Sequence, residues 1–198
     1  MLTSLHSVDI AFSFNLTDRA YTEACNCIKQ QESQGDLMYQ INDIVFHENG
    51  GVCRINNIGT PDFVTTGQLY YTLECLENPT TKVYVAFTHE SDIRYIITKE
   101  NAIQCLSGVR ELQGQYNEDN KNRDREYAEV LKSGNFQKWF CMLKGILHEK
   151  YVRNAAGKQL NLKDSRYLEQ VEKLIIQEFS IALDISAEDF KEKLETLV

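Results

Sequence analysis

The chain has 198 residues, 42% of them hydrophobic, and its formal net charge is −8 at pH 7. A chain of this length can bury roughly 70% of its extended surface, so it can fold without a disulfide or metal scaffold. The longest apolar runs, such as residues 174–176, fall far short of the ~18 residues of a membrane-spanning helix. We therefore expect a soluble protein, and the acidic balance argues against a general nucleic-acid-binding protein.

The first 37 residues predict a strand followed by a helix. Residues 8–16 alternate apolar and polar side chains, and residues 18–31 carry apolar side chains at helical spacing. The opening residues lack a positively charged segment and a continuous apolar core, so we expect no export signal and a cytoplasmic location. The six cysteines should then stay reduced, and their spacing predicts no zinc site.

Between residues 38 and 105 the pattern changes to short strands. Asn49, Gly50 and Gly51 separate two apolar runs and supply the positive φ that a hairpin turn needs. Several short strands in one small segment are typical of a small barrel. The expected strands lie near residues 40–47, 51–59, 67–77, 81–88 and 93–97.

After Asn101 the residues favour helices. The helical periodicity predicts helices at about 121–132, 135–151 and 163–183, and Ser186 is the expected N-cap of a short last helix. Trp139 lies on the apolar stripe of the second of these, so we expect it to pack in the core rather than to stack on a base. The predicted fold class is α+β: an extension over residues 1–37, a small β-barrel over 38–105 and an all-α helical bundle over 106–198.

One basic segment interrupts the acidic chain. Residues 121–166 contain 11 basic and 5 acidic side chains, and the segments on either side are net acidic. These charges fit either solvated helix faces or local phosphate contacts. Under the second interpretation the DNA-binding candidates are Lys121, Arg123, Arg125, Lys138 and Lys144.

The residues of the chain predict no enzymatic chemistry. His6, His47, His89 and His148 have no nucleophile or metal motif around them. Gly50 and Gly51 lead into a strand, so no glycine-rich phosphate loop is predicted. We expect no catalytic residue, no metal and no cofactor.

Several motifs, in order, give the chain a resemblance to a known family. The sequence YQINDIVFHENGGVCRINNI is followed by LYYTLEC, KVYVAF and the arginine of DIRYII. Further on come REYAEVLKSGN, LKDSRYL and IIQEFSIALDIS. Over about residues 38–190 this order resembles the CarD/CdnL family of bacterial transcription regulators.

The resemblance implies a Tudor-like or SH3-like barrel that docks on the RNA polymerase β subunit. It also implies a helical domain that contacts promoter DNA and stabilises the open complex. Strand 81–88 would offer its edge to the polymerase, because an exposed edge can add a partner strand. The polymerase-binding candidates are Lys82, Tyr84, Val85, Ala86 and Phe87, and we expect a monomer with weak, non-sequence-specific DNA contact.

The chain also departs from the family pattern. The family's wedge tryptophan would fall near Asn120, and its polymerase-contacting basic residues align near Pro61 and Tyr84. Met38 stands where the family usually starts. These departures leave open an alternative function, a protein-interaction module that does not contact DNA.

Overall fold

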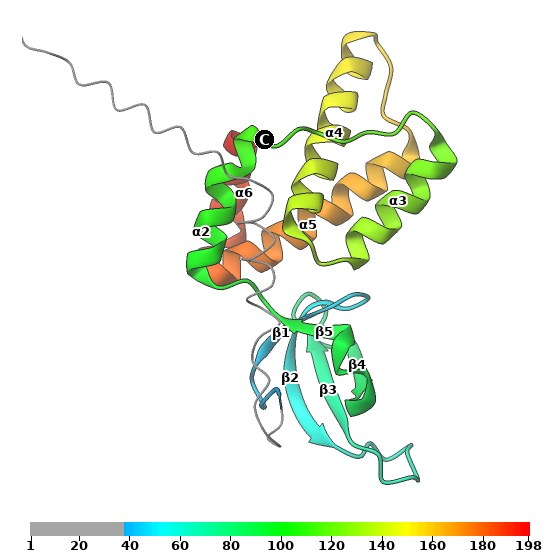
Figure 1. Cartoon of the computed structure of the whole chain (residues 1–198), viewed down its shortest axis with the longest axis vertical. Helices are drawn as coiled ribbons and strands as arrows, with labels where there is room; N and C mark the ends of the chain where they lie inside the picture. Colours follow the sequence, from blue (N-terminus) through cyan, green and yellow to red (C-terminus); the bar gives the residue numbers. More distant parts are fainter. Residues whose placement is uncertain (1–37) are drawn as a thin grey trace, which may run out of the picture. The chain divides into compact units, whose positions relative to one another are not determined.

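The computed structural model describes residues 38–198, which form an antiparallel sheet followed by helices (Figure 1). This arrangement confirms the predicted α+β class. These described residues make up one compact unit. The strand and helix predicted over residues 8–16 and 18–31 lie outside the described residues.

Five short strands build the sheet. They are β1 (Ile44–His47), β2 (Gly51–Gly59), β3 (Tyr70–Cys75), β4 (Lys82–Ala86) and β5 (Ile93–Tyr95). All pairings are antiparallel, in the order β4-β3-β2-β1-β5. The predicted hairpin turn joins β1 to β2, and its Gly51 has a φ of 65°, a conformation that side-chain-bearing residues rarely adopt.

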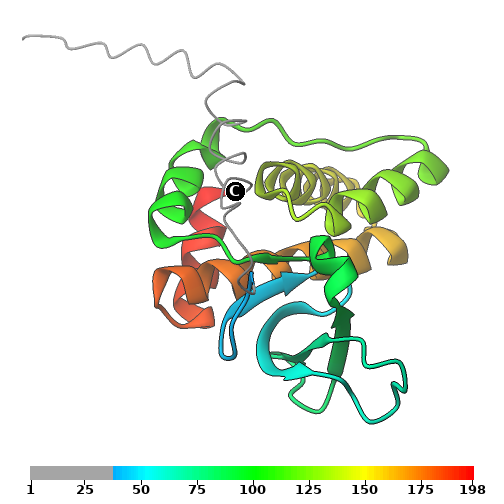
Figure 2. The same cartoon turned by 60° about the horizontal axis from the view of Figure 1, so that its bottom comes forward.

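The sheet curls around a core of its own. Every strand contributes to one buried cluster, made of Tyr39, Val45, Cys53, Ile55, Tyr71, Leu73, Cys75, Val85 and Ile93. The β2–β3 register shifts between Ile55 and Asn57, and such bulges bend a strand. Figure 2 shows the curvature of β2. The predicted small barrel thus corresponds to a strongly curved five-stranded sheet.

Each described α-helix begins directly after a polar N-cap residue. The helical elements are η2 (Phe87–Asp92), α2 (Lys99–Gly108), η3 (Val109–Glu111), α3 (Asn120–Lys132), α4 (Phe136–Ala155), α5 (Leu162–Leu183) and α6 (Ala187–Leu197). The side chains of Thr98, Asp119, Asn135, Asn161 and Ser186 each accept a hydrogen bond from the backbone three residues on. The helices predicted from residues 121, 135, 163 and 187 are confirmed, and α4 continues four residues beyond its predicted end.

Trp139 lies at the centre of the helical core, as its place on the apolar stripe predicts. Its side chain is fully buried, and its indole N–H donates to the Val130 carbonyl at 2.9 Å. Its ring packs against Phe136 of the same helix and against Phe46 of β1, with centroids 5.5 and 5.4 Å away. Phe46 thus joins the sheet to the helical core.

Candidate functional site

Strand β4 is an edge of the sheet, because only β3 pairs with it among the described residues. Phe87 N donates to Leu69 O at 3.1 Å, and Cys75 N donates to Thr81 O at 3.2 Å. In an antiparallel pair of strands, every second residue forms its backbone hydrogen bonds with the neighbouring strand. These two bonds show that the odd-numbered residues of β4 are the ones that bond to β3. The backbone N–H and C=O groups of Lys82 and Tyr84 therefore point away from the sheet and can pair with a further strand.

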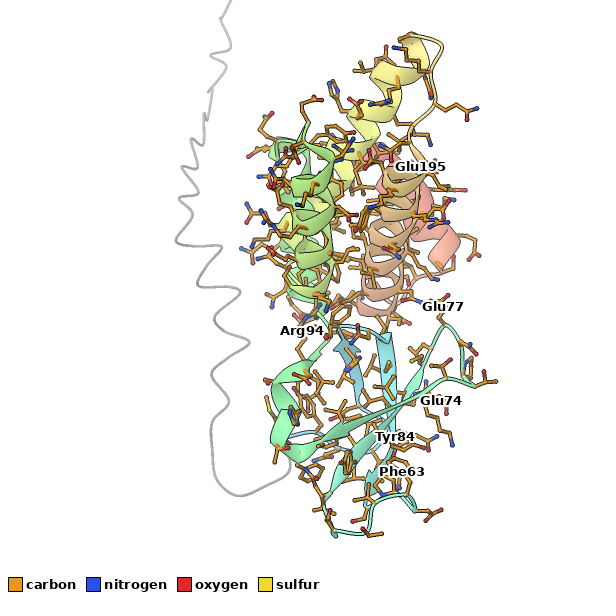
Figure 3. All side chains as sticks on the ribbon, turned by 90° about the vertical axis from the view of Figure 1, so that its right-hand side faces the viewer. Phe63, Glu74, Glu77, Tyr84, Arg94 and Glu195 are labelled. Atoms are coloured by element: carbon orange, nitrogen blue, oxygen red, sulfur yellow. The ribbon has the colours of Figure 1, made fainter. Side chains whose placement is uncertain are left out.

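An exposed aromatic pair lies beside this edge. Tyr84 is 41% exposed and Phe63 is 65% exposed, and their rings meet edge to face with centroids 4.9 Å apart. Figure 3 shows both side chains together on the sheet, at the end away from Arg94. Aromatic side chains that stay partly exposed are common anchors in protein interfaces. Phe63 belongs to the connection between β2 and β3, and the sequence motifs did not single it out.

The structure separates the five predicted polymerase-binding residues into two groups. Lys82 and Tyr84 are exposed. Val85 and Ala86 are buried, and Phe87 is half-buried with its ring stacked on Tyr71 at 4.4 Å. The first group can reach a partner with side chains, and the second group holds the edge strand on the sheet core.

Arg123, one of the predicted DNA-binding residues, is buried inside the helical core. Its Nε and Nη2 donate to the Asp164 carboxylate at 3.0 and 2.9 Å, and its Nη1 donates to the Asn117 carbonyl at 2.5 Å. Its guanidinium also lies 4.4 Å from the centroid of Tyr116. Burial disfavours the charged form, but the bonds to Asp164 outweigh it and raise the pKa of Arg123. The Arg123 guanidinium therefore links α3 to α5.

Lys144 is likewise occupied within the protein. Its Nζ donates to the Val109 and Arg110 carbonyls at 3.0 and 3.1 Å, at the end of η3. The Val109 carbonyl also accepts from Leu112 N at 3.2 Å, so Lys144 adds a second donor to it. Lys144 thus fastens the segment that leads out of η3 onto α4.

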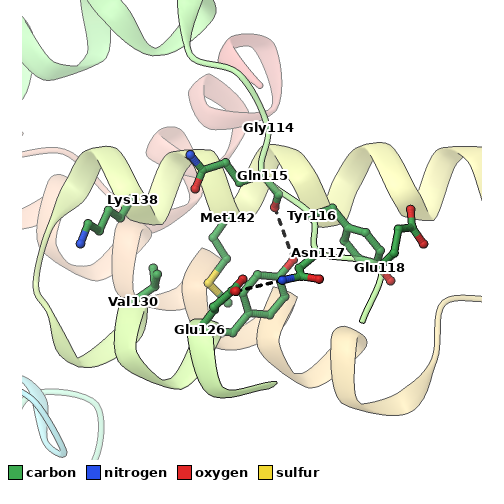
Figure 4. A pocket seen from close by; sticks show the side chains of 10 residues that line it. Gly114, Gln115, Tyr116, Asn117, Glu118, Glu126, Val130, Lys138 and Met142 are labelled. Carbon is green, nitrogen blue, oxygen red and sulfur yellow. Dashed lines mark hydrogen bonds between the residues drawn. The ribbon is translucent and has the colours of Figure 1, made fainter. Parts of the chain in front are cut away.

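The other three predicted DNA-binding residues are exposed. Lys121 and Arg125 lie four residues apart and so share one face of α3. Lys138 lines one end of a groove of about 590 Å³ between α3, α4 and the segment 114–118. Figure 4 shows Lys138 in this groove together with Glu118 and Glu126, whose carboxylates would repel a phosphate inside it. Lys121 and Arg125 therefore present charge on the exposed face of α3, whereas Lys138 lies at the end of a groove that also holds two carboxylates.

More basic side chains of this segment are free to contact an anion. Among the described residues, six lysines and arginines between positions 121 and 166 are exposed and lie in no ion pair with a carboxylate. They are Lys121, Arg125, Lys138, Lys150, Lys158 and Arg166. The positive charge of the segment is thus only partly neutralised from within the chain.

A buried ion pair joins the sheet to the helices. The Nη1 and Nη2 atoms of Arg94 on β5 donate to the two carboxylate oxygens of Glu178 on α5, at 2.6 and 2.9 Å. Glu178 is fully buried and also accepts from Ile97 N at 2.9 Å. The Arg94 guanidinium lies between the rings of Phe46 and Phe136. Sequence analysis singled out Arg94 only as part of a motif and missed Glu178.

The described part of the chain contains neither a metal-binding cluster nor a membrane-spanning helix. No three histidine, cysteine, aspartate or glutamate side chains of residues 38–198 lie together as a metal site would require. Within the same residues, no helix is both long and apolar enough to cross a membrane.

The described residues thus form a small curved sheet with an aromatic-flanked edge strand that no other described strand pairs with, joined to a helical bundle. Residues 39–97 match the family model of the CarD-like/TRCF RID domain. This match covers the sheet and agrees with the resemblance drawn from the sequence motifs. The match marks the chain as a transcription-related protein whose sheet is of the RNA polymerase-interacting kind. Comparison with curated proteins gives no match.

Proposed function

We propose that this protein is a CarD-like transcription regulator without enzymatic activity, whose β domain binds the RNA polymerase β subunit. The observation that carries the proposal is that the RID match spans the sheet, whose β4 edge is unpaired among the described residues. A strand of the polymerase would extend the sheet through the free backbone groups of Lys82 and Tyr84. Tyr84 and Phe63 would supply apolar contact beside it.

The edge is tested by replacing Tyr84 with proline. The Tyr84 N–H faces away from β3, so proline removes a donor to the partner strand and leaves the β3–β4 bonds in place. Tyr84→Ala is the matched control, because it removes the same ring and keeps the N–H. We expect Tyr84→Pro to capture much less purified β subunit than Tyr84→Ala does. Equal capture by the two variants, with unchanged circular dichroism, would rule out strand addition at β4.

We further propose that the protein makes weak, non-sequence-specific contact with promoter DNA and thereby modulates the stability of the open complex. Lys121, Arg125 and Lys138 are exposed in the basic segment and support it. Arg123 and Lys144 are left out, because their charged groups are bound inside the protein.

The DNA contact is tested through its salt dependence. Each lost phosphate contact should lower the slope of log affinity against log salt concentration by roughly 0.9. We expect Lys121→Glu, Arg125→Glu and Lys138→Glu together to flatten the slope and to shorten the lifetime of the open complex. Lys191→Glu makes one charge reversal of the same kind in the acidic helix α6 and should alter neither. An unchanged slope and lifetime in the triple variant would remove DNA from the proposed function.

One observation favours a second function, a protein-interaction module that does not contact DNA. The position of the family's wedge is taken by Asn120, whose side chain accepts a hydrogen bond from Arg123 at 2.7 Å. A short amide offers no apolar surface for prising base pairs apart. Capture of the β subunit that neither promoter DNA nor the triple variant changes would favour this second function.

A further inference from the structure

Two cysteines face each other inside the β domain. Cys53 of β2 and Cys75 of β3 are register partners, and their sulfur atoms lie 3.5 Å apart. Both side chains are buried and both are free thiols. The pair belongs to the core of the sheet and plays no part in the proposed polymerase contact.

The position of the pair in the ladder suits a cross-strand disulfide. Leu76 N donates to Val52 O at 3.0 Å, so the next pair along, Cys53 and Cys75, is a non-hydrogen-bonded pair. Opposite residues in such pairs have Cα atoms about 4.5 Å apart, which is within the range that a disulfide bridges. A change of side-chain torsion can therefore bring the sulfurs to the bonding distance of about 2.05 Å without a shift in register.

A glycine leaves room for this movement. A Cβ atom at Gly50 would lie 3.0 Å from the Cys53 sulfur and 3.3 Å from the Cys75 sulfur. Because Gly50 has no side chain, space remains between the β1–β2 turn and both sulfur atoms. The Gly50 carbonyl lies 3.5 Å from the Cys53 sulfur and accepts its weak S–H hydrogen bond.

We propose that Cys53 and Cys75 form a dithiol that peroxide converts into a disulfide between β2 and β3, which a dithiol reductant reopens by thiol–disulfide exchange. The thiolate of Cys75, the more exposed of the two, attacks one peroxide oxygen, so an S–O bond forms and the O–O bond breaks with loss of hydroxide. The Cys53 sulfur then attacks the sulfenic sulfur, the S–S bond forms and the oxygen leaves as water with the thiol proton. The hydroxide takes up the proton that the Cys75 thiol lost, so the two sulfurs are each oxidised by one electron and one peroxide is reduced to two waters.

The buried position makes this reaction slow. Desolvation, together with the hydrogen bond to Cys75, raises the pKa of the Cys53 thiol. The Cys53 thiolate, which closes the disulfide, is therefore scarce until the sheet opens locally. The dithiol accordingly responds to sustained exposure to peroxide rather than to a brief pulse. The disulfide closes a loop of about 20 residues and stabilises the strand pair on which β4 rests.

The test uses the folded full-length chain and hydrogen peroxide as the oxidant. After free thiols are alkylated, trypsin cuts at Lys29, Arg54 and Lys82 and leaves one cysteine in each of the peptides 30–54 and 55–82. We expect these two peptides to be joined, with a mass lower by two hydrogen atoms than the sum of the reduced peptides. The melting temperature should rise by roughly 5 °C or more and return after reduction.

Cys75→Ser is the matched control, because it removes one thiol and keeps a small side chain at the same position. This variant should give no joined peptide and no rise in melting temperature under the same treatment. The proposal is overturned if the folded chain gives no joined peptide, if Cys53 is linked to another cysteine, or if the link forms only in urea. A rise of equal size in Cys75→Ser would also overturn the stabilising effect.

Discussion

Trp139→Ala is expected to reduce the free energy of unfolding by roughly 3–5 kcal/mol, the usual cost of deleting a buried large aromatic side chain. Trp139 is fully buried and touches Phe136 of its own helix and Phe46 of the sheet. The variant also leaves the Val130 carbonyl without the indole N–H that it now accepts. In a chain of this size the melting temperature should fall by roughly 6–20 °C.

The measurement is urea unfolding of both proteins, with Trp139→Phe as the control. Phenylalanine keeps a large ring in the core and removes the indole N–H, so it should cost less than alanine does. Promoter binding separates the core role from a DNA-facing role. If Trp139→Ala melts at the wild-type temperature and no longer binds promoter DNA, Trp139 contacts DNA and the core assignment is wrong.

The sequence predicted most of the fold because local signals and packing agree. The alternation of strands and the turn at Gly50 and Gly51 fixed the first hairpin within a few residues. The helical apolar spacing and the cap at Ser186 placed the last helices. Such patterns depend on neighbouring residues, which a sequence displays directly. The predicted burial of Trp139 follows from the same spacing.

The candidate sites could be predicted only in part, because they depend on contacts between distant residues. Charge counting placed Arg123 among the DNA-binding candidates, but its carboxylate partner Asp164 lies 41 positions away in the sequence. The edge position of β4 depends on strand order, which periodicity does not determine. Phe63 has no regular spacing from Tyr84, so the aromatic pair was visible only in the structure.

One glycine contact shows the same dependence on tertiary structure. Gln115 N donates to Cys141 O at 2.8 Å, and this bond holds the segment after η3 against α4. A Cβ atom at Gly145 would lie only 2.0 Å from the Gln115 carbonyl oxygen. A glycine inside a long helix is locally unfavourable. Here it is required because another backbone passes so close to the helix.

The ion pair of Arg94 and Glu178 leads to the second large expected effect. Glu178→Ala should lower the free energy of unfolding by roughly 3–5 kcal/mol, because it leaves the Arg94 charge largely buried without its partner. The Ile97 N–H would also lose its acceptor. Lys163→Ala breaks the exposed pair with Asp124 and should change stability little, so it controls for the loss of an ion pair as such.

The double variant Arg94→Met with Glu178→Leu separates the energy of the pair from the cost of an orphaned charge. Replacing both members of a buried pair with apolar side chains of similar size is often neutral or stabilising. Arg94 already lies between Phe46 and Phe136, so a methionine there keeps apolar contact on both sides. We therefore expect the double variant to recover most of the stability that Glu178→Ala loses. If the double variant is as unstable as Glu178→Ala, the sheet and the helices depend on the charged pair itself, and the cost does not come from an unpaired Arg94.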